Sequence, residues 1–376
     1  MIIRSGLFLN VVYAVFGLAL LVQLFYYIYF YLRFCLFAGY GRISPDVPVS
    51  VIICARNEED NLRKFLPAVL EQEYSGFEVI VVNDCSEDNS FEVLGEYLAR
   101  YPHLKVSSIT RDPKFTHNKK FAQFIGIKAA KNDALLFTDA DCKPETNRWL
   151  SGMASVFDKK TDFVLGYGGY FKDKGLLNKY IRYESMIIAM QYFGMALRGM
   201  PYMGVGRNLA YKKSVFFRNR GFSSHNHIIS GDDDLFVNAN AGSENTRVEY
   251  SPETHTRSVP SPDIKTWFKQ KRRHLTTAVH YKFRDRIILV AEPASRVLFY
   301  VSAIILLVKA HLLPFVVAGL IIRMTTQVVI YSMAQKRLNE PGLLFSAIIF
   351  DIFSPFINLL VYFSNYHKSS CKSVWK

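Results

Sequence analysis

Two aspartates separated by one residue, Asp139 and Asp141, end the apolar run at residues 134–138. In an extended segment the side chains of residues i and i+2 point the same way, so both carboxylates would share one face. Magnesium in proteins typically binds one or two carboxylates together with substrate phosphates. The pair therefore predicts a divalent-cation site that clamps a diphosphate and stabilises a departing nucleotide.

A second acidic group, Asp232, Asp233 and Asp234, follows Gly231. Three carboxylates in a row would suit the positive N-terminal end of a helix. Crowded carboxylates also raise one another's pKa, which helps one of them act as a general base near neutral pH. We predict the second role for the cluster, although the cluster alone does not single out which aspartate performs it.

Further polar residues have both a structural and a chemical interpretation. Asp84 ends an apolar run and would either cap the following helix or accept a hydrogen bond from a nucleoside. Lys119 and Lys120 begin a basic helix, where they would either face solvent or counter phosphate charge. His225 and His227 have no Cys or third His nearby, so we assign them to a loop rather than to a metal site.

A basic run, residues 270–274, follows an aromatic pair at residues 267–268. Such a run could touch anionic lipid beside a membrane. We favour a site element, in which Gln270 and Arg273 bind diphosphate and the ring of His274 packs against donor or acceptor.

The elements that must position these residues alternate between strand and helix. Strands are expected at residues 49–54, 78–84, 106–110, 134–141 and 162–171, and helices at 58–72, 89–101 and 119–130. This alternation predicts a parallel sheet covered on both faces, with ligands beyond the carboxyl ends of the strands. Arg56, Asp84 and Asp139 would meet at that edge. No Gly-x-Gly-x-x-Gly follows the first strand, which argues against a dinucleotide-binding fold.

Long apolar segments lie at both ends of the chain. No charge occurs between Arg4 and Arg33. This uncharged segment is long enough to be an uncleaved membrane anchor rather than a signal peptide. Residues 297–308 and 312–322 predict a helical hairpin. A third segment, residues 343–363, contains Asp351 and Pro355 and could span, re-enter or lie in the interface.

Basic residues flank these segments, and the positive-inside rule therefore places the middle of the chain in the cytoplasm. The flanking residues are Arg33, Arg42, Arg286, Arg296, Lys336 and Arg337. We expect a multi-pass protein of the cell (inner) membrane with an anchor at 1–40, a cytoplasmic catalytic domain at 46–285, membrane or interfacial helices at 290–365 and a basic tail at 366–376.

The composition excludes several classes of protein. Hydrophobic residues make up 50% and charged residues 21%, which excludes a disordered chain. We attribute most of the net charge of +14 to the membrane flanks. No nucleic-acid partner is expected, because no recognition motif occurs. The five cysteines are scattered without a CxxC pair, which argues against a disulfide framework and a structural zinc site.

Seven motifs occur in a characteristic order: ARNEE, VVNDCS, NKKFAQFIGIKAA, FTDAD, GVGRNLAY, SGDDDLF and WFKQKRRH. In this order they resemble the membrane-bound branch of the inverting family 2 glycosyltransferases, which includes cellulose-, chitin- and hyaluronan-synthase-like enzymes. The resemblance extends from about residue 49 to the C-terminal hairpin. It implies an α/β GT-A fold, a Rossmann-like nucleotide-sugar domain, with N- and C-terminal transmembrane helices. It also implies a nucleotide-sugar donor, usually a UDP-sugar, and Mg²⁺ or Mn²⁺ as cofactor.

The resemblance also implies roles for individual positions. The nucleotide-sugar side would comprise Ala55, Arg56, Glu58, Asp84, Lys119, Asp139, Gln270, Arg273 and His274. Asp139 and Asp141 would hold the cation, and Gly206 and Asn208 would lie on the acceptor side. The family's catalytic base corresponds to Asp232, with Asp233 as the alternative.

Two departures from the family pattern bear on the acceptor. Gly231 replaces the glutamate before the base, and His274 replaces a tryptophan that stacks on the polymer in processive synthases. We therefore expect transfer of one sugar, or a few, to a hydroxyl of a glycan or lipid-linked glycan. A polyprenyl-phosphate sugar synthase is the first alternative. A non-catalytic membrane protein that binds nucleotide or anionic lipid is the second.

Overall fold

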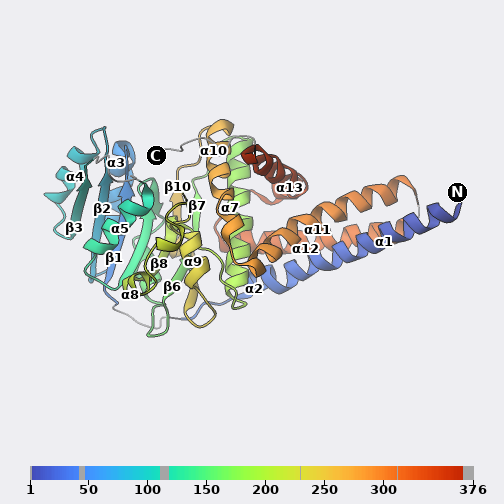
Figure 1. The fold of residues 1–376 in the computed structure, drawn as a ribbon, viewed down its shortest axis with the longest axis horizontal. Helices are drawn as coiled ribbons and strands as arrows, with labels where there is room; N and C mark the ends of the chain where they lie inside the picture. Colours follow the sequence, from blue (N-terminus) through green and yellow to red (C-terminus); the bar gives the residue numbers. More distant parts are fainter. Residues whose placement is uncertain (1, 42–46, 111–117, 229, 311, 367–376) are drawn as a thin grey trace.

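The computed structural model of the chain describes residues 2–41, 47–110, 118–228, 230–310 and 312–366 (Figure 1). A mixed α/β domain forms one half of the molecule, and long helices project from it. The expected basic tail falls almost entirely outside the described residues, as does Arg42.

A seven-stranded sheet with the order β3-β2-β1-β4-β8-β6-β9 forms the centre of the α/β domain. Its strands are β1 (Val49–Ala55), β2 (Phe77–Asp84), β3 (Leu104–Ile109), β4 (Ala134–Asp139), β6 (Phe163–Gly166), β8 (Leu209–Lys212) and β9 (Thr246–Glu249). The first four are parallel, as predicted, but β8 runs antiparallel between β4 and β6. The sheet is therefore mixed, and the expectation of a wholly parallel sheet was wrong.

Helices cover both faces of this sheet, each with its own buried apolar cluster. One face carries α3 (Glu59–Leu70), α4 (Ser90–Leu98) and α6 (Trp149–Ala154). The other carries α5 (Lys119–Ala129), α7 (Leu176–Ala196) and α9 (Asp234–Asn240). The short helix α8 (Lys213–Arg218) follows β8. The α/β fold with two covered faces is thus confirmed.

A second, three-stranded sheet has the order β5-β10-β7. Its strands are β5 (Cys142–Pro144), β7 (Gly168–Tyr170) and β10 (Thr256–Ser258). Two strands expected to be continuous are divided here, because β4 ends at Asp139 before a turn and residues 162–171 supply β6 to one sheet and β7 to the other. Asp141 therefore lies in a turn between two sheets and not on a strand.

Within the part of the chain that the structure describes, four helices are long and apolar enough to cross a membrane: Leu7–Leu36, Phe283–Val308, Leu313–Arg337 and Leu344–Ser364. The first consists of α1 (Ile2–Phe25), a π-helical segment (Tyr26–Tyr31) and α2 (Leu32–Leu36). It packs along α11 (Phe283–Val308) and α12 (Leu313–Arg337), and the three project together from the α/β domain (Figure 1). The predicted hairpin is α11 and α12, and α11 is continuous through residues 285–290, where we had expected a domain boundary.

The last helix, α13 (Leu344–Tyr366), packs against α7, α10 (Ile264–Leu275), α11 and α12. Its Asp351 is fully buried, and its carboxylate lies 2.6 Å from Arg323 Nη2 and 3.1 Å from Arg296 Nη1. Arg296 also pairs with Glu292. Arg296 is therefore not a flanking charge as we expected, because it lies inside α11 within a network in which the opposite charges balance.

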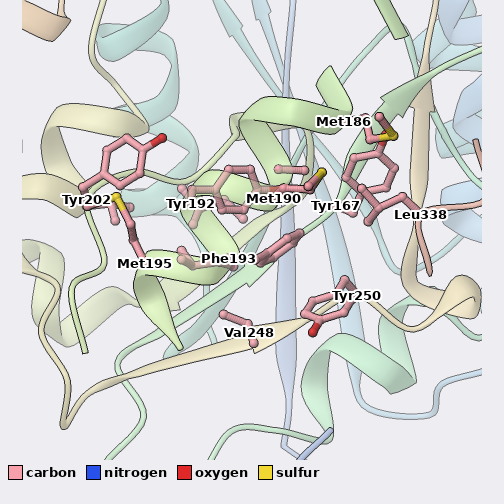
Figure 2. Close-up of a cluster of buried hydrophobic side chains, with 14 of the residues drawn as sticks. Tyr167, Met186, Met190, Tyr192, Phe193, Met195, Tyr202, Val248, Tyr250 and Leu338 are labelled. Atoms are coloured by element: carbon pink, nitrogen blue, oxygen red, sulfur yellow. The ribbon is translucent and has the colours of Figure 1, made fainter. Parts of the chain in front are cut away.

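The long apolar helices dock on the α/β domain through α7. An added Cβ at Gly194 of α7 would lie 2.6 Å from the carbonyl oxygen of Phe30, so glycine permits the close approach of the π-helical segment. Figure 2 shows the buried cluster beneath, in which Met190, Tyr192 and Phe193 of α7 lie with Leu338 from the loop after α12. The two halves of the molecule therefore share one continuous core.

Candidate active site

The carboxyl ends of β1, β2 and β4 lie side by side, as the sequence predicted. The strand register pairs Cys54 of β1 with Asp139 of β4. Asn57, in a left-handed conformation after β1, donates its N–H to Ser86 Oγ and accepts a hydrogen bond from the N–H of Glu87. These bonds hold the turn that carries Arg56 against the turn that follows Asp84.

Asp139, Asp141 and Cys142 form a group whose potential ligand atoms all lie within 4.8 Å of one another. Burial alone would raise the pKa of Asp139, but the charges of Lys119, Arg207 and Arg273 outweigh it and the pKa is lowered. Burial and the charge of Asp139 raise the pKa of Asp141, and burial raises that of the Cys142 thiol. Two carboxylates beside a protonated thiol fit a hard cation such as Mg²⁺ or Mn²⁺.

Lys119 joins this group to the second acidic cluster. Its ammonium nitrogen lies 2.7 Å from Asp139 Oδ1 and 3.5 Å from Asp232 Oδ2. The first turn of α5 thus places Lys119 beside Asp139, which lies 20 positions further along the chain, and beside the more distant Asp232. The same ammonium could accompany a substrate phosphate, because it lies between the candidate cation site and the candidate base.

The three adjacent aspartates have different surroundings. Asp234 accepts hydrogen bonds from Thr277 and Tyr281, and Asp233 accepts them from the N–H groups of Gly206 and Asp234. Asp232 Oδ2 is buried and accepts no hydrogen bond from the described residues. Asp234 and Asp233 therefore hold the local structure, whereas Asp232 retains an oxygen that can take a proton.

Asp233 should make the stability of the metal-free protein depend on pH. Burial, followed by the charges of Asp232 and Asp234, raises the pKa of Asp233 to about 7. The folded state therefore binds this proton more tightly than the unfolded state, and the resulting stability is lost as pH rises from about 4 to about 7. The slope contributed by one such group is at most about 1.4 kcal/mol per pH unit.

Thermal denaturation in chelator between pH 5 and pH 8 tests this expectation. The melting temperature should fall less steeply with pH in Asp233→Asn than in the unmodified protein. The substitution also alters hydrogen bonds, but that stability cost is the same at every pH. It therefore shifts the whole curve of melting temperature against pH and leaves the slope unaffected. Parallel curves would contradict the assigned titration.

The neighbouring lysines should respond differently to substitution. Lys120 is buried and donates hydrogen bonds to the carbonyls of His225 and Ile228, so it fixes the loop to which we had assigned the histidines. Lys120→Met leaves these carbonyls unpaired and should cost about 1–3 kcal/mol of stability. Lys119→Met should instead lower turnover by about 100-fold, because a cation facing the developing charge is lost.

Melting temperature and turnover of the purified variants separate the two effects. Each variant serves as the control for the other, since both remove one ammonium from the same turn of α5. Equal losses of turnover in the two variants, at equal stability, would contradict the distinction.

Arg207 is a site residue that the sequence analysis missed, although it lies within the GVGRNLAY segment. Its guanidinium carbon lies 4.1 Å from the centroid of the Tyr170 ring. Its charge acts on both Asp139 and Asp141, and its buried Nη1 has no hydrogen-bond partner among the described residues. A desolvated guanidinium beside two carboxylates is suited to a phosphate that arrives with a cation.

Helix α10 contributes to this group from the far end of the sequence. Arg273 is close enough to Asp139 for its charge to lower the carboxyl pKa. The pKa of His274 is lowered to about 3, first by desolvation and then by the charges of nearby cations, although the residue is exposed. These cations are Arg273, Lys271, Arg207 and Lys119. The imidazole of His274 is therefore neutral near pH 7. Gln270 instead accepts a hydrogen bond from Ser261.

Other predicted residues act as supports. Asn208 is fully buried, and its amide bonds to Trp149, Tyr167 and Thr254, so its side chain is held inside the core. The N–H of Gly206 holds Asp233. Glu58 Oε2 accepts a hydrogen bond from Asn61. Ala55 and Asp84 are buried at the ends of β1 and β2, so Ala55 offers its backbone rather than its side chain.

Comparison with known proteins now identifies the family. Residues 147–365 match the model of glycosyl transferase family group 2, and residues 50–218 match glycosyl transferase family 2. The chain is similar to the probable glycosyltransferase YdaM of Bacillus subtilis, with 26% identity over 60% of this chain and 54% of that protein. It is similar to the glycosyltransferase AglE of Haloferax volcanii, with 33% identity over 49% and 58%.

These alignments span about half the length of the curated relatives. Among solved structures, the mannosyltransferase PcManGT from Pyrobaculum calidifontis, in complex with GDP-Man and Mn²⁺, superposes with a TM-score of 0.57 over 92% of this chain and 99% of that one. At 18% identity this likeness concerns the fold alone. The expected GT-A fold is confirmed. The chain belongs to the family 2 glycosyltransferases.

Proposed function

We propose that this enzyme transfers one sugar, or a few, from a nucleotide-sugar donor to a hydroxyl of a glycan or lipid-linked glycan, with inversion at the anomeric carbon. The observation that carries this proposal is the placement of Asp232. Its buried Oδ2 accepts no hydrogen bond from the described residues and forms an ion pair of 3.5 Å with Lys119, which in turn lies 2.7 Å from Asp139. A candidate base and a candidate cation site are thus separated by a single side chain.

In the proposed reaction, Asp232 accepts the proton of the acceptor hydroxyl as its oxygen attacks the anomeric carbon. The bond from that carbon to the nucleoside diphosphate breaks, and the diphosphate leaves on the opposite side, so an α-linked donor gives a β-linked product. Asp139 and Asp141 would hold a divalent cation, which would supply positive charge to offset that of the leaving diphosphate. Lys119, Arg207 and Arg273 add further positive charge on the same side.

The donor side of the proposal rests on the phosphate-binding chemistry of the residues at this edge of the sheet. Arg56 and Asp84 lie at the edge where a nucleoside would sit, and Arg207 offers an unpartnered N–H beside the carboxylates. The solved neighbour was crystallised with GDP-Man and Mn²⁺, which supports a divalent cation. We propose a UDP-sugar as donor, and Mg²⁺ or Mn²⁺ as the cation.

We further propose that residues 1–40 anchor the enzyme, that the catalytic domain at 46–285 lies on the cytoplasmic side of the cell (inner) membrane, and that the helices at 290–365 lie in or on the bilayer. Lys336 and Arg337 line one pocket with Tyr250 and Glu253 of the α/β domain, and Arg33 and Arg286 lie near the ends of their long apolar helices, which supports this orientation. Protease added to intact cells should leave the catalytic domain uncleaved. Cleavage of the catalytic domain by external protease would contradict the proposed orientation.

A panel of nucleotide sugars tests the function directly. The purified protein in lipid nanodiscs is incubated with each donor, with Mn²⁺, Mg²⁺ or chelator, and nucleoside diphosphate release is measured. We expect cation-dependent release for one donor class. Mass analysis of products from glycan, lipid-linked glycan and polyprenyl-phosphate acceptors then separates the alternatives. A product on polyprenyl phosphate alone would overturn the hydroxyl-acceptor proposal, because that acceptor is already an anion.

A further inference from the structure

The loop between α12 and α13 inserts a buried glutamate into the α/β domain. Glu340 is fully buried, as are Leu338 and Leu343 on either side of it. Arg182 Nε donates to one of its carboxylate oxygens over 2.7 Å, and Tyr167 Oη donates to the other over 2.8 Å. The Arg257 guanidinium also donates to the second oxygen. A residue between two membrane helices is thus fixed by groups from α7, β10 and the segment between β6 and β7.

Strand β10 carries this contact to the candidate cation site, because its alternate side chains point to opposite faces. Arg257 faces the loop, where it also donates to the carbonyls of Leu338 and Asn339 and pairs with Glu145. Ser258 faces the other way and donates a hydrogen bond of 2.8 Å to Asp141 Oδ2.

Thr256, on the same side of β10 as Ser258, donates a hydrogen bond of 3.0 Å to the carbonyl of Arg207. One short strand therefore holds both a candidate cation ligand and the backbone of a candidate phosphate-binding arginine. The position of this strand, in turn, is set by Arg257 and its carboxylate partners.

The packing around the contact leaves little freedom. An added Cβ at Gly169 would lie 2.3 Å from Arg257 Nη1 and 2.9 Å from Glu340 Oε1, so the glycine makes room for the pair. Leu338 belongs to the same apolar cluster as Tyr167 and Met186 (Figure 2). Arg182 and Arg257 balance the charges of Glu340 and Glu145, and loss of either carboxylate leaves a guanidinium less well held.

We propose that Glu340 is a positioning residue, which sets the Asp141 carboxylate for cation binding through Arg257 and Ser258. The membrane helices α12 and α13 thereby hold one wall of the active site in place. This inference rests on the proposed role of Asp141 as a cation ligand. It differs from a general stabilising role because it predicts a specific loss of cation affinity.

The test compares Glu340→Gln and Ser258→Ala in the full chain in lipid nanodiscs. Binding of Mn²⁺ in the presence of UDP is measured from the electron paramagnetic resonance signal of free Mn²⁺. Partners of a metal ligand typically contribute 10–100-fold to affinity, so each variant should raise the Mn²⁺ dissociation constant by about 10-fold. The double variant should bind no more weakly than the weaker single variant, because both changes act on one path.

Glu253→Gln is the matched control, since its partly buried carboxylate pairs with Arg148 in the same region but lies outside the path. It should bind Mn²⁺ as the unmodified protein does. If Glu340→Gln does not fold, Glu145→Gln provides a second test, because it weakens the other ion pair of Arg257. This variant should also raise the Mn²⁺ dissociation constant.

Unchanged Mn²⁺ affinity in the folded Glu340→Gln or Glu145→Gln variant, or additive losses in the double variant, would overturn the positioning role and leave the proposed function intact. Absence of Mn²⁺ binding by the unmodified protein would instead overturn both.

Discussion

Replacing Asp232 by asparagine is expected to lower turnover by about 1,000-fold while the donor KM stays within a few-fold of its original value. Asparagine keeps the size of the side chain but cannot take the acceptor proton. The buried Oδ2 of Asp232 accepts no hydrogen bond from the described residues, and the substitution removes its 3.5 Å ion pair with Lys119. The backbone bonds of the cluster go to Asp233, so the surrounding fold should be little disturbed. Initial rates over a range of donor concentrations, at saturating acceptor and cation, give both constants.

Asp233→Asn is the matched control for this variant. Its carboxylate accepts hydrogen bonds from the N–H groups of Gly206 and Asp234, so its removal should disturb the base only through position and charge. We expect a smaller loss of turnover than in Asp232→Asn. A larger loss would transfer the role of base to Asp233, and near-full activity in both variants would refute a base in this cluster.

Removal of the divalent cation by chelator should abolish donor turnover, and Mn²⁺ or Mg²⁺ should restore it. Asp141→Asn should then need at least about 100-fold more cation for half-maximal activity, because a lost direct ligand should cost no less than a lost outer partner. Asp139 would remain, but its charge is already shared with Lys119 2.7 Å away. Cation titrations of donor hydrolysis give the required concentrations.

Cys142→Ala tests whether the carboxylates or the thiol of the group Asp139, Asp141 and Cys142 bind the cation. Burial raises the pKa of the Cys142 thiol, and its S–H donates to Asp141 Oδ1 over 3.4 Å. A protonated thiol is a poor ligand for a hard cation, so this variant should keep its cation requirement within a few-fold. A stronger effect in Cys142→Ala than in Asp141→Asn would mean that the cation site is assigned to the wrong atoms.

The sequence predicted the parallel half of the fold because its strands are long, apolar runs between amphipathic helices. β1, β2 and β4 match the predicted runs closely, so the edge at which Asp84 and Asp139 meet could be foreseen. β8 was missed because it has only four residues and its pairing with β4 and β6 is tertiary. β7 was not separated from β6 because a single residue, Tyr167, lies between them and their assignment to different sheets depends on tertiary pairing.

The candidate site was foreseen where acidic residues cluster within a few positions. A site residue was missed where one side chain of an otherwise apolar segment turns toward the candidate site. Arg207 stacks on Tyr170, whereas its neighbour Asn208 is consumed by hydrogen bonds in the core. The sequence presents these two polar residues alike, and only their packing distinguishes them. Lys119 and Lys120 were undecided for the same reason, since adjacent residues on a helix point in different directions.

The sequence by itself determined the alternating α/β domain, the acidic motifs and the apolar membrane segments, because each depends on the residue types within a short stretch. The tertiary structure alone decided that Lys119 lies between Asp139 and Asp232, that Arg296 is paired inside the membrane helices and that Glu340 reaches β10. Ion pairs and hydrogen bonds between distant residues depend on distances of a few ångströms, and those are fixed only when the whole core packs.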